Sequence, residues 1–153
     1  MPPYFQSTHS LFVKVPPEKV YEALTDWALR AQWRKGIGIS WEGESKAFLN
    51  QKVTFTVMGF PSYSFSFRVT GMEPPRRLFM EYLDKLLRGR TAIEIEPDQN
   101  GCQVAFHWMN VEPAGWLARI YFALGLGTRA HRVRAMETLR MLKEYLEKSA
   151  QKA

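Results

Sequence analysis

Three histidines, His9, His107 and His131, are the side chains of this sequence best suited to acid–base chemistry or to metal binding. Imidazole is a common zinc ligand, and three imidazoles around one cavity would suggest a metal site. His9 and His107 fall in the first and last strand-like segments, whereas His131 falls on the apolar stripe of a helical segment. Their chemistry therefore depends on which way each segment faces.

The alternation of the last strand-like segment decides the direction of His107. The bulkier face of that segment is expected to point inward, which turns His107 outward. That bulkier face consists of Val104, Phe106 and Trp108. The opposite phase, which would turn His107 inward together with Ala105 and Met109, stays open. With His107 turned outward, no metal and no cofactor is expected. His9 and His131 are interpreted as histidines of the core rather than as general bases.

The remaining residues with chemical potential are isolated. Glu94 and Glu96 share a strand face that is predicted to be the outer one, and Asp84 stands alone at the end of a strand. The sequence contains no nucleophile elbow, phosphate-binding loop, Cys/His cluster or dinucleotide fingerprint. Any catalysis would therefore be acid–base work on a bound apolar substrate, with His131 or Tyr82 exchanging the proton.

The composition indicates one domain, residues 1–153, with an unusually aromatic interior. The chain has ten Phe, six Tyr and five Trp, and its length allows a core without a metal or a disulfide. Cys102 is the single cysteine, so no disulfide can form within the chain, and a reducing cytoplasm is expected. The first residues show no signal-peptide pattern, and no apolar run approaches the roughly 20 residues of a membrane span.

The charge is moderately basic, with 21 Lys and Arg against 15 Asp and Glu and a net charge of +6. There is no run of basic residues interleaved with aromatic ones, so no nucleic-acid partner is expected. The arginines of the last third are interpreted as a solvated helix face rather than as a site. They are Arg119, Arg129, Arg132, Arg134 and Arg140.

The first quarter of the chain predicts a strand and two short helices. The strand runs from Tyr4 to Val15, and Pro17 begins the first helix, where its missing N–H costs nothing. Thr25-Asp26 reads as a break with a new N-cap, and Trp27 and Trp33 lie on the apolar side of the second helix.

From Ile39 to Val111 the sequence is nearly all strand. The clearest alternation of apolar and polar residues runs from Tyr63 to Val69, and turn residues follow at Met72 to Pro75 and at Pro97 to Gly101. The connections are short, which favours an antiparallel meander because parallel pairs need long crossovers.

The final segment, from Pro113 to about Lys148, predicts a long helix with an apolar stripe that includes His131. Gly125 and Gly127 weaken this helix and can kink or break it. Trp116 to Leu126 is apolar nearly all round. We therefore expect that part to be buried on more than one side, to lie at the mouth of a cavity, or to serve as a peripheral membrane or homodimer contact.

The order of these elements and three local patterns resemble the START-like superfamily, also called the Bet v 1-like or SRPBCC fold, and within it the polyketide cyclase/dehydratase and lipid-transport group. The patterns are VPPEKVYEALTD at residues 15–26, Trp33 before Gly36, and VTGMEPPRRL at residues 69–78. The sequence departs from the family where many members have a glycine entering the third strand, because Asn50-Gln51 stands there.

The resemblance implies an α+β helix-grip fold, in which a curved seven-stranded antiparallel sheet wraps around a long C-terminal helix, with two short helices between strands 1 and 2. In this fold the first and last strands are neighbours, and a cavity lies between the sheet and the helix. The residues expected to line the cavity are His9, Phe55, Phe65, Phe67, Met80, Tyr82, Ile93, Phe106 and Trp108 from the strands, and Ile120, Leu124 and His131 from the helix.

The expected function is the binding or carriage of a hydrophobic small molecule or lipid in that cavity. The alternative is a polyketide cyclase or dehydratase that uses His and Tyr acid–base chemistry in the same cavity. The few polar groups expected on its wall favour binding.

Overall fold

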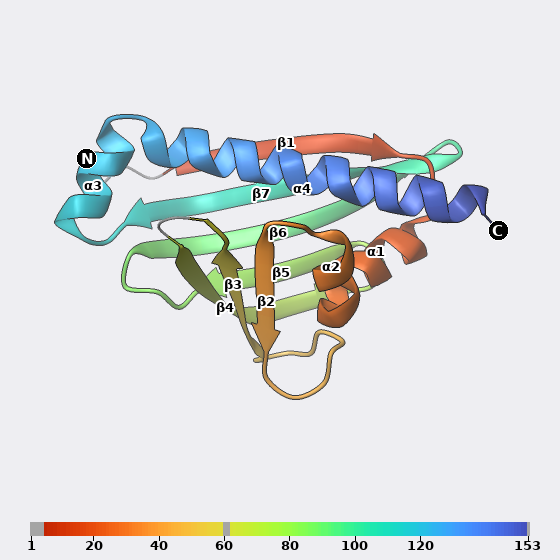
Figure 1. The fold of residues 1–153 in the computed structure, drawn as a ribbon, viewed down its shortest axis with the longest axis horizontal. Coiled ribbons are helices and arrows are strands. Elements are labelled where there is room, and N and C mark those ends of the chain that lie inside the picture. The colour runs from red at the N-terminus through yellow and green to blue at the C-terminus, as the bar shows by residue number, and fades with distance from the viewer. Residues whose placement is uncertain (1–4, 60–61, 153) are drawn as a thin grey trace.

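The computed structural model describes residues 5–59 and 62–152 and has an α+β architecture. A seven-stranded antiparallel sheet, in the order β1-β7-β6-β5-β4-β3-β2, curls around the C-terminal helix α4 (Figure 1). The predicted helix-grip fold is therefore confirmed. The elements are β1 (Phe5–Val13), α1 (Pro17–Thr25), α2 (Trp27–Trp33), β2 (Ile37–Trp41), β3 (Lys52–Val57), β4 (Tyr63–Glu73), β5 (Arg77–Tyr82), β6 (Leu87–Asp98), β7 (Gly101–Pro113), α3 (Trp116–Ala123) and α4 (Leu126–Gln151).

The pairing of β3 with β4 shows how alternation builds the inner face of the sheet. Phe55 lies directly opposite Phe65, and both rings point towards α4. On the outer face, Thr54 lies opposite Ser66, and their hydroxyl groups are 2.9 Å apart. Such cross-strand pairs fix the register, because a slip of one residue would turn the aromatic rings outward.

The two short helices begin where the sequence predicts. Pro17 opens α1, and Asp26 caps α2 by accepting a hydrogen bond from the backbone N–H of Leu29 at 3.3 Å. The first strand is described from Phe5 to Val13, while Tyr4, its predicted first residue, lies outside the described residues. α1 and α2 lie at the end of the sheet opposite α3 (Figure 1).

Gln51 organises the loop between β2 and β3, where the sequence departs from the family pattern. Its side chain is 1% exposed and accepts a hydrogen bond from Trp27 Nε1 at 2.8 Å. Its amide nitrogen donates to the carbonyl oxygens of Glu42 and Glu44, each at 2.8 Å. The glutamine thus satisfies backbone groups of the loop and joins it to α2.

The C-terminal segment is two helices, not the single helix predicted from Pro113 to about Lys148. Pro113 instead ends β7, where it pairs with Leu87. The chain breaks between α3 and α4 at Gly125, whose φ of +76° is a left-handed conformation that glycine adopts without strain. The glycines that weaken the predicted helix therefore mark a real interruption.

α3 is anchored by one ring and leaves most of its apolar side chains outside. Phe122 is buried, and its ring centroid lies 5.0 Å from that of Phe5 and 5.9 Å from that of Trp108. Gly127 at the start of α4 permits this packing, because a Cβ atom there would lie 2.6 Å from the Phe122 ring. The expectation that Trp116 to Leu126 is buried on several sides is wrong, since Trp116 is 71% exposed.

α4 closes the main core along β1 and β7 (Figure 1). The buried side chains of α4 at one helical face contact the interior of the sheet and account for its orientation. They are Ala135, Thr138, Leu139, Leu142 and Leu146. No helix within residues 5–59 and 62–152 is long and apolar enough to cross a membrane.

Candidate functional site

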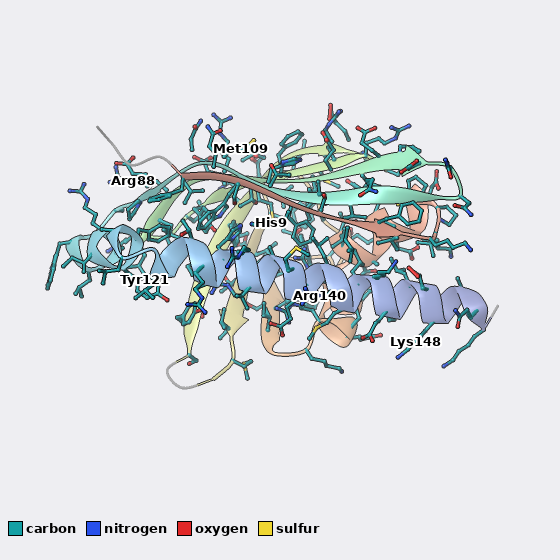
Figure 2. All side chains as sticks on the ribbon, turned by 90° about the horizontal axis from the view of Figure 1, so that it is seen from above. His9, Arg88, Met109, Tyr121, Arg140 and Lys148 are labelled. Carbon is teal, nitrogen blue, oxygen red and sulfur yellow. The ribbon has the colours of Figure 1, made fainter. Side chains whose placement is uncertain are left out.

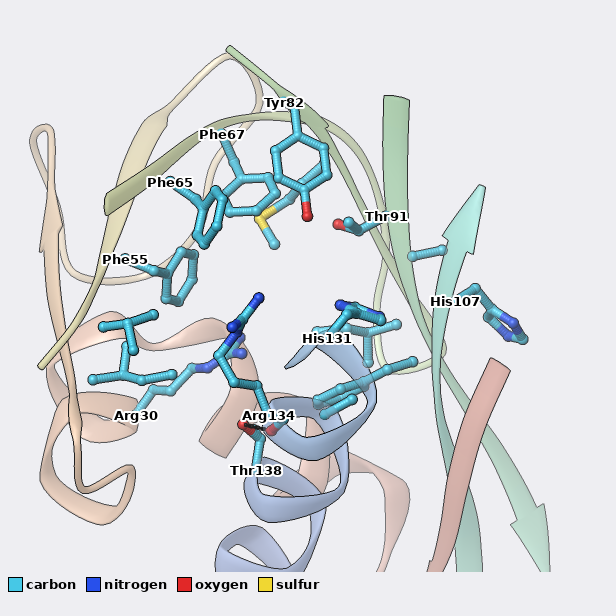
Figure 3. Close-up of a pocket in the computed structure, with 17 residues that line it drawn as sticks. Arg30, Phe55, Phe65, Phe67, Tyr82, Thr91, His107, His131, Arg134 and Thr138 are labelled. Carbon is cyan, nitrogen blue, oxygen red and sulfur yellow. Dashed lines mark hydrogen bonds between the residues drawn. The ribbon is translucent and has the colours of Figure 1, made fainter. Parts of the chain in front are cut away.

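A cavity of about 140 Å³, here called the inner cavity, lies between α4 and the concave face of the sheet (Figure 3). An engineered protein cavity of roughly 150 Å³ holds a benzene molecule, so the inner cavity has room for one ring or a short chain. The residues that line it are Arg30, Ile37, Phe55, Val57, Phe65, Phe67, Met80, Tyr82, Thr91, Ala92, Ile93, Phe106, His107, His131, Arg134, Ala135 and Thr138.

Most of the predicted wall residues lie on this cavity. Those are Phe55, Phe65, Phe67, Met80, Tyr82, Ile93, Phe106 and His131. Three of the rings pack edge to face or tilted: Phe67 lies 5.5 Å from Phe55 and 4.5 Å from Tyr82 between centroids. Because the aromatic wall is braced by its own contacts, the cavity is shaped before a ligand enters.

Four predicted wall residues lie elsewhere. Ile120 and Leu124 are 51% and 69% exposed, because the break at Gly125 separates α3 from α4 and α3 turns Phe122, not these two residues, inward. Trp108 is 2% exposed and packs behind His131 instead of lining the inner cavity. His9 points from β1 towards α4, with its ring centroid 5.8 Å from that of His131, and is also absent from the cavity wall (Figure 2).

His107 follows the preferred phase of the last strand. His107 belongs to the wall of the cavity, but its ring points away from the cavity, towards the outer face of β7 (Figure 3). On the outer face its Nδ1 lies 2.9 Å from the Thr8 hydroxyl, and its Nε2 lies 3.8 Å from Glu94. Within residues 5–59 and 62–152, no three His, Cys, Asp or Glu side chains gather as metal ligands do.

His131 is held flat against Trp108. The two rings are nearly parallel, with centroids 3.7 Å apart and an angle of 3° between their planes. The Nε2 atom of His131 is buried without a hydrogen-bond partner among the described residues. Burial, followed by the charges of Arg134 and His9, lowers the pKa of His131 to about 3. The ring is therefore neutral at pH 7 and is a weak proton acceptor.

Tyr82 faces His131 across the cavity (Figure 3). Its hydroxyl oxygen accepts a hydrogen bond from Trp108 Nε1 at 2.8 Å, which leaves the phenolic proton free to be donated to a ligand. Burial raises the pKa of Tyr82 above its usual range, and the hydrogen bond from Trp108 and the charge of Arg134 only partly oppose this. Tyr82 can therefore donate a hydrogen bond, but it does not give up its proton at neutral pH.

Arg30 is a cavity-lining residue that sequence reasoning missed. It is 8% exposed and lines the cavity from α2, and its guanidinium carbon lies 5.0 Å from the centre of the Phe55 ring. One of its nitrogens donates to the carbonyl oxygen of Leu24 at 3.2 Å, while its buried Nε has no partner in the described part of the chain. Burial, and then the neighbouring charge of Arg34, lowers the pKa of Arg30 to about 9, so it remains a cation at pH 7.

Arg134 is the second missed cation, and it corrects the prediction that the late arginines form a solvated face. It projects from α4 into the middle of the cavity (Figure 3). Its guanidinium carbon lies 5.5 Å from the centres of the Tyr63 and Phe65 rings, and one nitrogen donates to the Tyr63 hydroxyl at 2.7 Å. Arg129, in contrast, is exposed as predicted.

Spacing contains a signal for both arginines. Arg30 lies three residues from Trp27 and three from Trp33, so it shares the apolar face of α2. Arg134 lies three residues after His131 on α4 and therefore shares its stripe. A charged residue inside an apolar stripe indicates either a buried ion pair or a ligand site, and the sequence alone does not distinguish the two.

A second hollow of about 490 Å³, here called the outer groove, adjoins the inner cavity. Phe65 and Arg134 line both spaces, so they form the boundary between them. The outer groove runs between α3, the start of α4 and strands β4, β6 and β7, and its wall is mostly apolar. Its lining residues are Tyr63, Phe65, Leu86, Leu87, Trp108, Leu117, Ala118, Tyr121, Phe122, Gly127, Ala130 and Arg134.

Comparison with known proteins agrees with this architecture. A family model described as polyketide cyclase/dehydrase and lipid transport matches residues 4–147. No curated protein matches the chain.

Several solved structures share the fold at low sequence identity. An uncharacterised protein from Rhizobium leguminosarum is 13% identical with a TM-score of 0.73, and the match covers 97% of each chain. The di-domain ARO/CYC protein StfQ of the steffimycin biosynthetic pathway is 14% identical with a TM-score of 0.77, over 95% of this chain and 52% of that one. The Aha1 dimer of Colwellia psychrerythraea is 17% identical with a TM-score of 0.63, over 91% of this chain and 96% of that one.

Proposed function

Because the chain belongs to the polyketide cyclase/dehydrase and lipid transport family, we propose that it binds and carries a hydrophobic small molecule or lipid in the inner cavity. The observation that carries the proposal is the aromatic wall around a preformed space of about 140 Å³. The outer groove extends this space, so that a ligand longer than one ring can be accommodated.

The polar groups on the wall support binding over catalysis. Efficient proton transfer at neutral pH needs groups with pKa values near 7. The pKa of His131 is lowered to about 3 and that of Tyr82 is raised, so neither matches that requirement. Both can still form hydrogen bonds that orient a ligand.

The test measures binding of N-phenyl-1-naphthylamine, a neutral fluorescent probe, together with native mass spectrometry of the gently purified protein. Phe67→Asp places a carboxylate inside the aromatic wall and should weaken probe binding at least tenfold. Phe79→Asp makes the same change on the outer face of β5 and should leave binding unchanged.

A second variant keeps the test decisive if Phe67→Asp does not fold. Ala135→Leu fills the inner cavity from α4 without adding charge and should weaken the probe in the same way. The proposal would be contradicted if circular dichroism showed that Phe67→Asp and Ala135→Leu are both folded and both bound the probe with unchanged affinity.

The second candidate function is a cyclase or dehydratase. It is favoured by one observation: the Nε2 atom of His131 has no hydrogen-bond partner among the described residues, and the ring lies on the cavity wall opposite Tyr82. The candidate predicts loss of turnover of a polyketide-like substrate in His131→Ala. Turnover retained by that variant would exclude His131 as the essential base.

The exposed side chains of α3 support a further part of the proposal, that α3 is the place where the protein contacts an anionic membrane. This surface, the α3 face, carries Trp116, Leu117, Ile120, Tyr121 and Leu124, each at least 46% exposed. Arg119 and Arg129 are exposed beside it. Aromatic and aliphatic residues flanked by arginine suit the interface of an anionic bilayer. Leu117 and Tyr121 also line the outer groove, so contact would bring lipid to its mouth.

Vesicle flotation tests the α3 face. The protein should float with vesicles of phosphatidylcholine and phosphatidylserine, and less with phosphatidylcholine alone. Trp116→Ser combined with Leu117→Ser should reduce flotation at least fivefold, whereas Val133→Ser on α4 should not. A dimer in sedimentation that the double variant dissociates, without flotation of the parent protein, would assign the α3 face to a second copy of the chain instead.

A further inference from the structure

The charged side chains that line the inner cavity are all positive. The described residues of its lining include the guanidinium groups of Arg30 and Arg134 and no carboxylate. Among the described residues neither arginine forms an ion pair. An apolar cavity for a neutral ligand has no need of two cations. The unpaired charge of Arg30, which is 8% exposed, is costly to bury, whereas Arg134 is half-buried and donates to the Tyr63 hydroxyl.

Arg34, the C-cap residue of α2, is a buried arginine whose charge is balanced by an acid. It is 3% exposed, and it pairs with Glu137 at 3.5 Å and donates from Nε to the Thr138 hydroxyl at 2.7 Å. Arg30 is almost equally buried, yet among residues 5–59 and 62–152 its only hydrogen-bond partner is the Leu24 carbonyl oxygen. The protein therefore supplies an acid to one buried arginine and leaves the other exposed to the cavity.

The register of the sheet brings the two uncompensated cations together. Arg30 stacks over Phe55 at 5.0 Å and Arg134 over Phe65 at 5.5 Å, and these two rings are directly opposite partners on β3 and β4. Figure 3 shows both guanidinium groups on the side of the cavity facing these rings. Arg134 also borders the outer groove, whereas Arg30 lines the inner cavity only.

We propose that the ligand is an amphiphile with an acidic headgroup, a carboxylate or a phosphate. The headgroup lies in the inner cavity against Arg30 and Arg134, and the apolar body extends past Phe65 into the outer groove. This inference rests on the proposed function and names the chemical class of the ligand. An anion between two guanidinium groups would accept several charge-assisted hydrogen bonds and would supply the missing countercharge.

Isothermal titration calorimetry at pH 7 with three probes of one chain length tests the inference. The probes are decanoate, decyl phosphate and decan-1-ol, which share the apolar body and differ in the headgroup. At least one of the two acids should bind ten times more tightly than the alcohol. Tighter binding of decanoate assigns a carboxylate headgroup, and tighter binding of decyl phosphate assigns a phosphate.

Substitution of each arginine locates the headgroup. Arg30→Met and Arg134→Met should each reduce the preference for acid over alcohol at least fivefold, while the affinity for decan-1-ol changes less than twofold. Arg140→Met removes an exposed cation from α4 and should leave the preference intact. Because each arginine is tested separately, misfolding of one variant leaves the other to decide.

The outcomes separate this inference from the proposed function. Equal affinity for acid and alcohol in the parent protein overturns the acidic headgroup but leaves apolar binding in place. A preference for acid that survives in both arginine variants also overturns it, because the headgroup then lies elsewhere. Failure of all three probes and of N-phenyl-1-naphthylamine to bind would reject the proposed function together with this inference.

Discussion

Arg30 and Arg34 are two buried arginines on one short segment with opposite energetic roles. Arg34 has an acid, Glu137, and a hydroxyl partner, whereas in the described part of the chain Arg30 has a single carbonyl oxygen as partner and an Nε without one. Burying a charge without a partner destabilises the protein, while removing one half of a buried pair also destabilises it. The two residues should therefore respond to the same substitution in opposite directions.

We predict that Arg30→Met raises the free energy of unfolding of the unliganded protein by about 1–3 kcal/mol, because it removes an uncompensated buried charge. Arg34→Met should lower it by about 2–4 kcal/mol, because Thr138 and Glu137 lose their partner. Urea titration measures both values. A loss of more than 1 kcal/mol in Arg30→Met would mean that Arg30 serves the fold and not a ligand.

His131 makes stability depend on pH. Its pKa in the folded protein is about 3, below the 6.5 of the unfolded chain, so the unfolded state binds the proton more readily. The stability that follows is fully present above pH 6.5 and is lost as the pH falls towards 3. Between pH 7 and pH 5 this single group removes about 2 kcal/mol.

His131→Phe keeps a flat ring against Trp108 and should abolish most of that loss. His107→Asn, on the outer face of β7, is the matched control and should keep it. Urea titrations at pH 7 and pH 5 supply the comparison. A variant that loses as much stability as the parent protein would show that another group is responsible; His9, whose pKa is also lowered by burial, is the first to examine.

At the scale of single residues, the sequence predicted which aromatic side chains line the cavity better than which charged ones do. Phe55, Phe67 and Tyr82 could be assigned to the cavity, because strand alternation and bulk are local properties. Arg30 and Arg134 could not, because their burial depends on whether an acid lies near them in space. Arg34 illustrates the problem, because the acid that compensates it, Glu137, lies 103 residues away in the chain and no local pattern pairs the two.

The junction between α3 and α4 depends on the contact of Gly127 with the Phe122 ring. A side chain at 127 would have to displace the ring by which α3 is anchored. Gly127→Ser should therefore cost about 1–2 kcal/mol of stability and speed amide hydrogen exchange in α3. Gly115→Ser is the control, because a Cβ there meets no atom within 4 Å and serine is a favourable N-cap. Equal effects of the two changes would contradict this account.

The loop between β2 and β3 depends on Gln51. Gln51→Leu keeps the volume but leaves Trp27 Nε1 and the carbonyl oxygens of Glu42 and Glu44 unpaired, which should cost about 2–4 kcal/mol. Gln32→Leu, at an exposed position of α2, should change stability by less than about 0.5 kcal/mol. Thermal unfolding of both variants measures the difference, and a small effect of Gln51→Leu would mean that water replaces the glutamine.

The elements were predictable to the extent that their signals are local. Pro17 at the first position of α1 and the Asp26 cap of α2 marked where the helices begin. The hairpin between β6 and β7 was also found, although its turn is only Gln99-Asn100 and not the whole predicted loop 97–101, since Pro97 and Asp98 end β6 and Gly101 begins β7. The end of β7 could not be predicted, because a proline such as Pro113 fits either the first turn of a helix or the last position of a strand, here beside Leu87. The position of α3 was also missed, since it depends on the tertiary contact of Phe122.

The whole molecule encloses its cavity from several parts of the chain. Arg30 comes from α2, the aromatic wall from β3 to β7, and His131 and Arg134 from α4. The order of the elements and the resemblance to a known family correctly predicted the curved sheet and the long helix that surround this space, because packing such a sheet on one long helix leaves few arrangements. A ligand bound there contacts elements that separate when the protein unfolds.

Ligand binding should therefore raise the unfolding temperature of the whole chain. A free ligand at 100 times its dissociation constant stabilises the folded state by about 2.7 kcal/mol, which corresponds to roughly 5–10 °C for a chain of this size. Decanoate at that excess should give this shift in differential scanning calorimetry, and Phe79→Asp should give the same shift. At the same decanoate concentration Phe67→Asp should give at most about half of this shift, because a tenfold loss of affinity leaves about 1.4 kcal/mol of ligand stabilisation. The affinity falls because the new carboxylate repels the headgroup and wets the aromatic wall. A shift of the same size in Phe67→Asp would place the ligand outside the inner cavity.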